Sequence, residues 1–365
     1  MLFSSTPVLV VANSARMLTK LLVDNNFQVV AIDCYGDADT RHYSLDSFCI
    51  EKLEGDFFNN LLLQLREKYA INYVFYGTGF EQNEDSLHFL QEHFELVGNS
   101  YQLYSKLRNK ADFFQLLEKH KLPHPQVCFD SSVPHESGLR KPCDSFGGIG
   151  LVFHQPQRTQ SDNYYWQEYL EGHPCSVLFV ANGFDYKIIG FNRQLVQEID
   201  DQPFVFSGLI AQIEVPNVVR TKIKHSLELL VKHYELKGLC SLDFILSNAQ
   251  CYILEINARV SASAQLYGSQ VMQWHFSACN DGVLPEQICL PPKQAYKIIF
   301  SESEFSIPAN VSWPNWVVDR PPEGRQISKN QPICSIIVDY ESSDNVANLL
   351  QHYAHIVKNH LLSGS

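Results

Sequence analysis

The first hundred residues alternate between short apolar runs and segments whose apolar residues recur at helical spacing. The apolar runs, each of strand length, lie at 7–12, 27–33 and 71–77, and the helical segments lie at 15–25, 61–69 and 85–93. Strands that alternate with helices form a parallel sheet covered by helices on both faces. This pattern predicts a parallel α/β domain over residues 1–100.

The rest of the chain predicts α+β structure. Residues 101–125 are helical up to Pro123 and Pro125, which stop a helix because proline lacks the backbone N–H that a helix interior needs. Further along, short strands and turns are expected at 126–182, a helix at 217–236, strands at 240–246 and 251–257, and a final helix near 345–361. A length of 365 residues suits two or three domains of about 100–200 residues each.

Composition excludes several classes of protein. The formal net charge of -12 argues against a nucleic-acid partner, because phosphate binding needs clustered Lys and Arg. The ten cysteines are scattered without a CxxC pair, which indicates reduced thiols rather than a zinc or disulfide framework. The N-terminus lacks the basic segment of a signal peptide, and no run approaches the roughly 18 apolar residues of a membrane span. We therefore expect a cytoplasmic protein that binds neither nucleic acid nor membrane.

Two neighbouring predicted strands carry polar residues that suit a metal ion. Glu255 and Asn257 project to one face, because side chains alternate along a strand. Asp243, on the preceding strand, joins them only if the connecting loop has three residues or the hairpin contains a bulge. A plain two-residue turn would instead pair Asp243 with Leu254. Carboxylate and amide oxygens are ligands that Mg2+ prefers, and the alternative is a solvated hairpin edge.

A glycine cluster follows Lys141 and contains Gly147, Gly148 and Gly150, with Ser145 before them. Glycines let backbone N–H groups approach a polyphosphate closely, and a nearby lysine adds positive charge. The segment is not a Walker loop, because no GK[ST] follows. The alternative interpretation is a β-turn.

A third segment, from Glu168 through Tyr169 and Leu170 to Glu171, ends a predicted strand. Backbone groups there can contact the edge of adenine, and an acidic side chain can hold ribose hydroxyls. Taken alone, the segment is an ordinary amphipathic strand. A Rossmann nucleotide site is disfavoured, because the first strand is followed by Val-Ala-Asn-Ser-Ala-Arg rather than GxGxxG.

In their order and spacing, these motifs resemble the ATP-grasp superfamily. The resemblance begins at Lys110, continues through the glycine cluster and the strand after it, and ends with the two metal-binding strands, covering roughly residues 101–280. It implies a domain at 1–100 that precedes ATP-grasp, and an ATP-grasp domain of two α+β subdomains at 101–285. The lid subdomain would lie at about 110–170, and a small β-rich appendage at 286–365.

The resemblance also implies roles for individual residues. Asp243, Glu255 and Asn257 would bind magnesium, and Lys141 and Arg259 would act as catalytic cations on the migrating phosphoryl group. Contacts to ATP would come from Lys110, Lys141, Ser145, Gly147, Gly148, Gly150, Glu168, Tyr169, Leu170 and Glu171.

Two positions depart from the family pattern. Many members carry a ribose-binding acid two residues before the serine that corresponds to Ser176, and this chain has Pro174 there. Glu171 is the nearest substitute, which leaves the ribose contact open. The metal strand reads Asn-Ala-Arg where Asn-Pro-Arg is commonest, a change that keeps both functional side chains.

Further stretches are similar to a narrower branch, the predicted ATP-dependent carboligases of one-carbon-metabolising bacteria. They contain Ser14, Arg16, Glu81 and Arg193, and residues 172–177 also look like the corresponding run in tyramine–glutamate ligases of methanofuran synthesis. This similarity implies that the four residues contact substrate. Three of them lie on strand-end loops, where open α/β sheets bind ligands. The alternative for each is turn chemistry or a surface ion pair.

The implied function is that of an ADP-forming ligase that uses ATP with Mg2+, or with Mn2+ as an alternative metal. It would join a carboxylate to an amine through an acylphosphate, in biosynthesis of a one-carbon carrier cofactor of the methanofuran or methanopterin type. A homodimer is the assembly that many members of the superfamily suggest. The alternatives are an ATP-grasp kinase or phosphotransferase and a non-catalytic nucleotide-binding regulatory module.

Overall fold

The N-terminal part of the chain is a parallel sheet, seen in a computed structural model that describes residues 6–81, 83–130, 138–144, 147–154, 163–342 and 345–362. The strand order is β3-β2-β1-β4-β5. The strands are β1 (Val8–Val11), β2 (Val29–Asp33), β3 (Asp46–Cys49), β4 (Tyr73–Tyr76) and β5 (Glu95–Val97).

Helices cover both faces of this sheet. They are α1 (Arg16–Val23), α2 (Ala38–Tyr43), α3 (Gly55–Tyr69) and α4 (Glu84–His93). Val8 and Val10 of β1 pack in the cluster that contains α1, whereas Leu9 and Val11 pack in the cluster that contains α3 and α4. The predicted parallel α/β fold of this part is confirmed. Helix α2 and edge strand β3 were not predicted, because neither shows a clear apolar period.

A larger sheet forms the centre of the molecule, with the order β14-β13-β10-β11-β12-β15-β19-β17 and antiparallel neighbours. Its strands are β10 (His173–Asn182), β11 (Tyr186–Ile199), β12 (Gln202–Ile210), β13 (Lys237–Ser247), β14 (Gln250–Asn257), β15 (Gln294–Phe300), β17 (Val317–Val318) and β19 (Pro332–Asp339).

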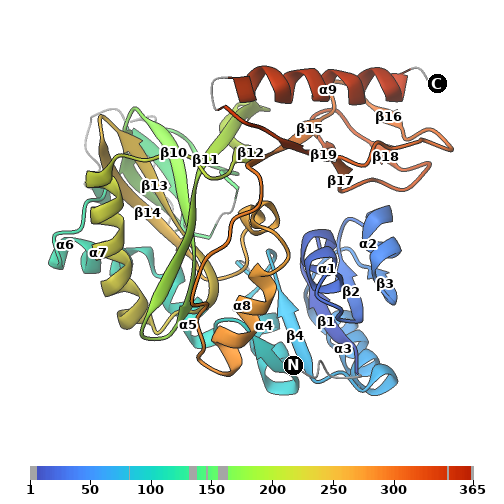
Figure 1. Ribbon diagram of the computed structural model, residues 1–365, viewed down its shortest axis with the longest axis horizontal. Coiled ribbons are helices and arrows are strands. Elements are labelled where there is room, and N and C mark those ends of the chain that lie inside the picture. The colour runs from blue at the N-terminus through green and yellow to red at the C-terminus, as the bar shows by residue number, and fades with distance from the viewer. Residues whose placement is uncertain are drawn as a thin grey trace.

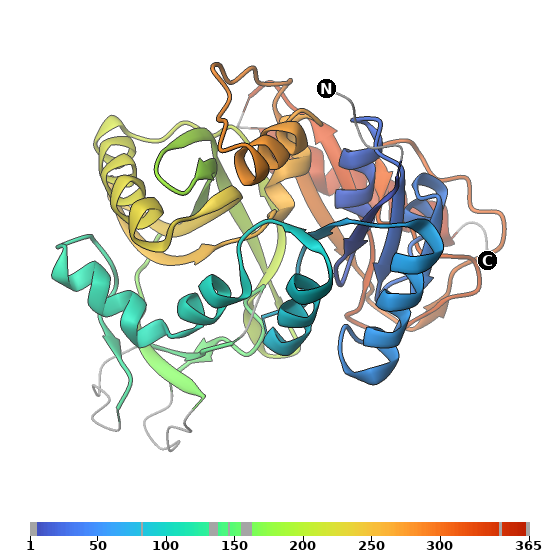
Figure 2. The same cartoon turned by 90° about the horizontal axis from the view of Figure 1, so that it is seen from below.

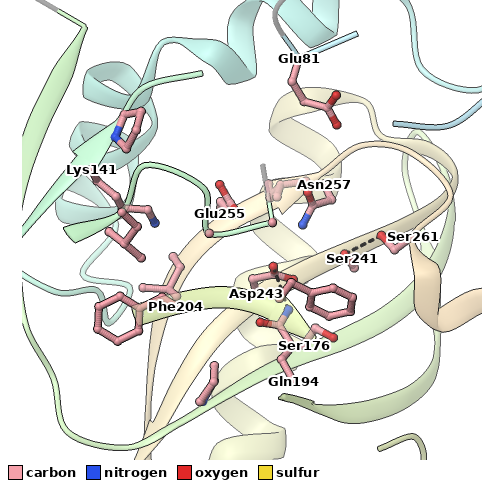
Figure 3. A pocket seen from close by; sticks show the side chains of 18 of the residues that line it. Glu81, Lys141, Ser176, Gln194, Phe204, Ser241, Asp243, Glu255, Asn257 and Ser261 are labelled. Carbon is pink, nitrogen blue, oxygen red and sulfur yellow. Dashed lines mark hydrogen bonds between the residues drawn. The ribbon is translucent and has the colours of Figure 1, made fainter. Parts of the chain in front are cut away.

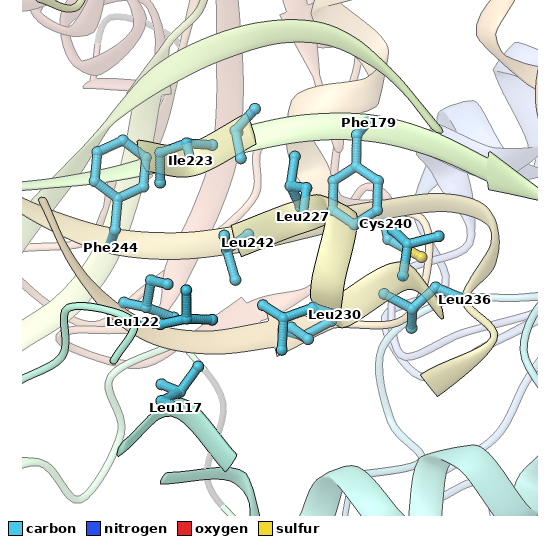
Figure 4. Packing of buried hydrophobic residues seen from close by; sticks show 14 of the residues in the cluster. Leu117, Leu122, Phe179, Ile223, Leu227, Leu230, Leu236, Cys240, Leu242 and Phe244 are labelled. Atoms are coloured by element: carbon cyan, nitrogen blue, oxygen red, sulfur yellow. The ribbon is translucent and has the colours of Figure 1, made fainter. Parts of the chain in front are cut away.

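The two faces of the central sheet have different neighbours. Helix α7 (Asn217–Tyr234) covers one face, where Leu227 packs with Leu242 of β13 in a large buried cluster (Figure 4). Helix α8 (Val271–Asn280) packs on the other face against Leu178 of β10. The alternation of a strand therefore sends odd residues of β10 to α7 and even residues towards α8 and the N-terminal sheet.

A smaller sheet, which we call the lid, has the order β6-β9-β7-β8. Its strands are β6 (Val127–Cys128), β7 (Gly138–Pro142), β8 (Val152–Phe153) and β9 (Tyr164–Glu168), and helices α5 (Tyr101–Arg108) and α6 (Lys110–Lys119) lead into it. The predicted helical stretch thus breaks at Asn109 and ends before Pro123. Figure 2 shows the lid and the N-terminal sheet at opposite ends of the molecule.

The C-terminal segment continues the central sheet, because β15 pairs with β12. Helix α9 (Val346–Leu362) lies across β15 and β19 (Figure 1), and β16 (Phe305–Ser306) pairs with β18 (Gln326–Ile327) at its edge. The predicted α/β and α+β multidomain architecture is confirmed. Among the described helices, none has the length and apolar character to cross a bilayer.

A buried arginine joins the N-terminal sheet to the C-terminal segment. The Arg16 guanidinium, 4% exposed, donates from Nε to Asp319 Oδ1 at 2.7 Å and from Nη2 to Gln265 Oε1 at 2.8 Å. Asp39 strengthens the same interface by accepting from the Asp319 backbone N–H at 2.9 Å. Because Asp319 pairs with its charge, Arg16 holds the N-terminal sheet and the C-terminal segment together.

Replacing Asp319 by Asn should destabilise the protein, because the buried Arg16 charge would lose its partner. We expect the free energy of unfolding to fall by about 3–5 kcal/mol, measured by urea denaturation. The control is Asp24→Asn in the exposed Lys20–Asp24 pair, both of whose side chains are 38% exposed. That change should cost about 0.5 kcal/mol or less. Equal losses in the two variants would show that Arg16 does not hold these two parts together.

Candidate functional site

The β13–β14 hairpin brings two carboxylates together by means of a bulge. Its turn has two residues, Asn248 and Ala249, whose φ angles of 47° and 59° fit a type I′ turn. Continued regularly, the pairing from this turn would place Leu254 opposite Asp243. The register shifts next to Asp243, and Asp243 pairs with Glu255 instead. The requirement for a bulge or a longer loop is confirmed, and a bulge fulfils it.

The same face of the sheet gathers further polar residues. Ser176 of β10 lies opposite Asp243, and Ser241 of β13 lies opposite Asn257. These positions alternate with apolar residues that pack on α7. The face opposite α7, in the part that α8 leaves uncovered, therefore presents a polar surface built from three adjacent strands.

This surface forms one wall of a cavity of about 510 Å3, within the roughly 300–1,000 Å3 of typical ligand sites (Figure 3). The lid and the strand ends of the N-terminal sheet form the other walls. The predicted site residues in the cavity wall are Glu81, Lys110, Lys141, Gly147, Gly148, Tyr169, Leu170, Asp243, Glu255, Asn257 and Arg259.

Glu255 lies among cations from two other elements. Lys110, the first residue of α6, donates from Nζ to Glu255 Oε2 at 3.1 Å. Burial by itself would raise the pKa of Glu255, but the charges of Lys110 and Lys141 outweigh it and lower that pKa. Glu255 is therefore ionised in a side chain that is 27% exposed.

Asp243 is in the opposite electrostatic situation. Burial, followed by the charge of Glu255, raises the pKa of Asp243. Gln194 of β11 donates to Asp243 Oδ2 at 3.0 Å, and the buried Oδ1 has no hydrogen-bond partner among the described residues. An unpartnered buried carboxylate oxygen is costly unless a donor or cation uses it. With Glu255 and Asn257 beside it, this oxygen fits the ligand set of Mg2+.

Arg259 connects the cavity to the N-terminal sheet. Its Nε donates to Glu81 Oε1 at 2.8 Å, and its Nη2 lies 3.4 Å from Asn257 Oδ1. Burial would raise the pKa of Glu81, but the Arg259 charge lowers it. The guanidinium keeps further N–H groups that an anion in the cavity can use.

The glycine loop (147–150) and the segment after β9 border the cavity next to Lys141. Gly147, Gly148, Tyr169 and Leu170 lie in its wall. These residues come from the lid and from the connection between the lid and β10. A ligand in the cavity would therefore lie between the lid and the central sheet.

Other predicted residues do not lie in the cavity wall. Glu168 turns away and accepts from the Gln126 backbone N–H at 3.1 Å, and Arg193 bonds to His173 Nδ1 at 2.9 Å on the other face of the sheet. Ser145 lies outside the described residues. The structure also keeps Ser14, Arg16, Gly150 and Glu171 out of the cavity wall.

Gln167 is a cavity residue that the sequence interpretation missed. It is 4% exposed, lines the cavity, and its Oε1 has no hydrogen-bond partner among the described residues. Strand alternation was the available signal, since Gln167 and Glu168 are neighbours on β9 and therefore point to opposite faces.

The end of the cavity beyond Asn257 is lined with hydroxyl groups that were also missed. The hydroxyl oxygens of Ser241 and Ser261 lie 2.8 Å apart, and the buried Ser263 hydroxyl has no hydrogen-bond partner among the described residues (Figure 3). Thr78 of the N-terminal domain completes this end. Ser241 lies on β13, and Ser261 and Ser263 follow β14, but single serines carry no distinguishing pattern in sequence.

Comparisons with known proteins agree with this geometry. The ATP-grasp domain family matches residues 107–263. An uncharacterised protein of Methanocaldococcus jannaschii, MJ0776, is 22% identical over 94% of this chain and 89% of its own length.

Solved structures share the fold at low sequence identity. Biotin carboxylase from Campylobacter jejuni, solved with β,γ-ATP, has a TM-score of 0.73 at 13% identity, covering 93% of this chain and 89% of its own. N5-carboxyaminoimidazole synthetase from Staphylococcus aureus, solved with ADP, has a TM-score of 0.72 at 14% identity, covering 97% and 98%. L-amino acid ligase from Bacillus licheniformis has a TM-score of 0.70 at 12% identity, covering 96% and 97%.

The matched domain contains the lid, the bulged hairpin and most of the cavity wall, and the likeness in fold extends over nearly the whole chain. The chain therefore contains an ATP-grasp domain at residues 107–263.

Proposed function

We propose that the cavity binds ATP with Mg2+ and that the protein ligates a carboxylate to an amine. The observation that carries this proposal is the meeting of Asp243, Glu255, Lys110 and Lys141 in one cavity, with an unpartnered carboxylate oxygen on Asp243. Carboxylates to hold a divalent cation and lysines to hold phosphates are the charges that a Mg-nucleotide requires.

In the proposed reaction a carboxylate oxygen attacks the γ-phosphorus of ATP, and ADP leaves. The amine nitrogen then attacks the acyl carbon of the acylphosphate, loses a proton and displaces phosphate. Phosphoryl transfer is accelerated mainly by positioning and charge neutralisation. Lys141 and Arg259 would supply fixed positive charge. Mg2+ held by Asp243, Glu255 and Asn257 would supply more when bound.

The structural neighbours support this proposal by their own chemistry. They include an L-amino acid ligase and an N5-carboxyaminoimidazole synthetase solved with ADP. The finer parts of the proposal are a cytoplasmic location, homodimeric assembly, Mn2+ as a substitute metal and synthesis of a one-carbon carrier cofactor. They rest on the sequence alone, the cytoplasmic location on composition and the others on the resemblance.

A product screen tests the reaction class directly. Amino acids and aromatic amines are offered in pairs with Mg-ATP, beginning with glutamate and tyramine, and both ADP and free phosphate are measured. A ligase releases both, and only when acid and amine are present together. ADP without free phosphate identifies a kinase instead, and nucleotide binding without turnover across the screen identifies a regulatory module.

Replacing Glu255 by Gln should abolish turnover while keeping the fold, since the side chains have the same shape. We expect the rate of ADP formation to fall by about 100-fold or more, because the charge that would hold the cation is gone. The matched control is Glu228→Gln on the exposed face of α7, which should be neutral. ADP formation at the wild-type rate in Glu255→Gln would contradict the proposed role of this carboxylate.

Gln167 should favour adenine over guanine. Its unpartnered Oε1 can accept from the exocyclic amine of adenine, whereas guanine would present a carbonyl oxygen at that position. Gln167→Leu should weaken ATP binding by about 2–10-fold and reduce the preference for ATP over GTP, measured by competition with a fluorescent nucleotide. Gln273→Leu, at an exposed position of α8, is the control. An unchanged ATP to GTP ratio in Gln167→Leu would exclude this contact.

A further inference from the structure

The β11–β12 hairpin holds the glycine loop of the lid through backbone contacts. The Phe206 backbone N–H donates to the Gly147 carbonyl at 2.8 Å, and the Gly150 N–H donates to Gln202 Oε1 at 2.9 Å. Both partners of the loop belong to β12. The loop is thus bonded to the central sheet from both of its ends, although it belongs to the lid.

A very close approach fixes the middle of the loop. Gly148 has a φ of +77°, and a Cβ at this position would lie 2.0 Å from the Phe204 carbonyl oxygen. Gly147 has a similar φ of +63°, but a Cβ there would find its nearest atom at 4.0 Å. Only glycine fits at 148 while the loop rests on β12, whereas position 147 has open space.

Aromatic rings pack together beside this contact between the loop and β12. The Phe204 ring lies 5.3 Å from the ring of Phe153 in lid strand β8 and 6.2 Å from the ring of Tyr169. Phe204 also lines the cavity, on the side where Lys141 lies (Figure 3). The lid strand, the segment after β9 and the hairpin therefore meet at one residue of β12.

The other strand of the hairpin contacts the metal-binding face. Gln194 of β11 donates to Asp243 Oδ2 at 3.0 Å. A single two-stranded element thus bonds both the loop over the cavity and the carboxylate beneath it. Among the residues that the structure describes, no other element hydrogen-bonds to both.

We infer that the β11–β12 hairpin is the seat on which the glycine loop closes over a bound nucleotide, and that Gln202 and the Phe204 carbonyl position the loop there. This inference rests on the proposed function, because it assigns the loop the task of retaining Mg-nucleotide. Gln202 and the Phe204 carbonyl are positioning groups: they act on the ligand through the loop. Their loss should shorten the residence time of the nucleotide without removing its charged contacts.

The central test compares Gly148→Ala with Gly147→Ala by stopped-flow dissociation of N-methylanthraniloyl-ADP in the presence of Mg2+. Both substitutions put a side chain at a positive φ, but only the first collides with β12. We expect dissociation to be about tenfold faster or more in Gly148→Ala, and at most about threefold faster in Gly147→Ala. Equal dissociation rates in the two variants would contradict the proposal that the β11–β12 hairpin positions the glycine loop.

The side-chain contact is tested in the same assay. Gln202→Ala removes the acceptor for the Gly150 N–H and should accelerate dissociation by about 2–10-fold. Gln197→Ala, an exposed position on the neighbouring strand of the hairpin, should dissociate at the wild-type rate. A wild-type rate in Gln202→Ala would remove Gln202 from the proposal.

Hydrogen exchange without nucleotide keeps this inference separate from the proposed function. The Phe206 amide is protected by the Gly147 carbonyl, so a peptide covering 202–206 should exchange faster in Gly148→Ala than in Gly147→Ala. If the wild type fails to bind the fluorescent nucleotide but shows this difference, the proposed function is wrong and the seat stands. If the nucleotide binds and the exchange rates are equal, the seat is wrong and the proposed function stands.

Discussion

Two carboxylates that face each other across a hairpin set the requirements for the rest of the cavity. Asp243 and Glu255 are directly opposed in a partly buried site, an arrangement that repels unless positive charge is supplied. Lys110, at the start of α6, and Lys141, in the lid, supply part of it. Because the cations come from elements outside the hairpin, the pair becomes stable only when the helix, the lid and the central sheet are assembled together. A divalent cation would complete the compensation, which links folding of the site to its proposed ligand.

The strand-end loops of the N-terminal sheet contribute to the site in an indirect way. Such loops bind ligands in many open α/β sheets. Here Glu81 pairs with Arg259 and Arg16 pairs with Asp319, so these charges hold the N-terminal sheet against the central and C-terminal parts. Glu81 still forms part of the cavity wall, whereas Arg16 is buried in the interface. A charged residue on a strand-end loop can therefore line the ligand cavity or join two parts of the protein. Only the position of its partner distinguishes these two roles.

Much of the fold could be predicted from sequence because its signals are local. The alternation of strands and helices in the first hundred residues, and the long helix α7, depend on apolar periodicity within each segment. Helix α2 and strand β3 are short and lack that period, so their place depends on tertiary contacts: β3 pairs with β2, and α2 packs on α1 and β3. In the site, the same rule explains why Gln167 was missed. Its chemical type gave no signal, and the direction of its side chain depends on the pairing of β9 within the lid.

The sequence by itself determined which residue types were present and at what spacing: two acids and an amide on consecutive strands, a lysine before a glycine cluster, and a parallel α/β segment ahead of them. Only the tertiary structure decided how they meet. The bulge that turns Asp243 towards Glu255, the bond from Gln194 to Asp243, and the contact between Gly148 and Phe204 all join residues that are distant in sequence or depend on strand register. A one-residue change of register reverses the face of every side chain, and no local pattern records which register the packed sheet adopts.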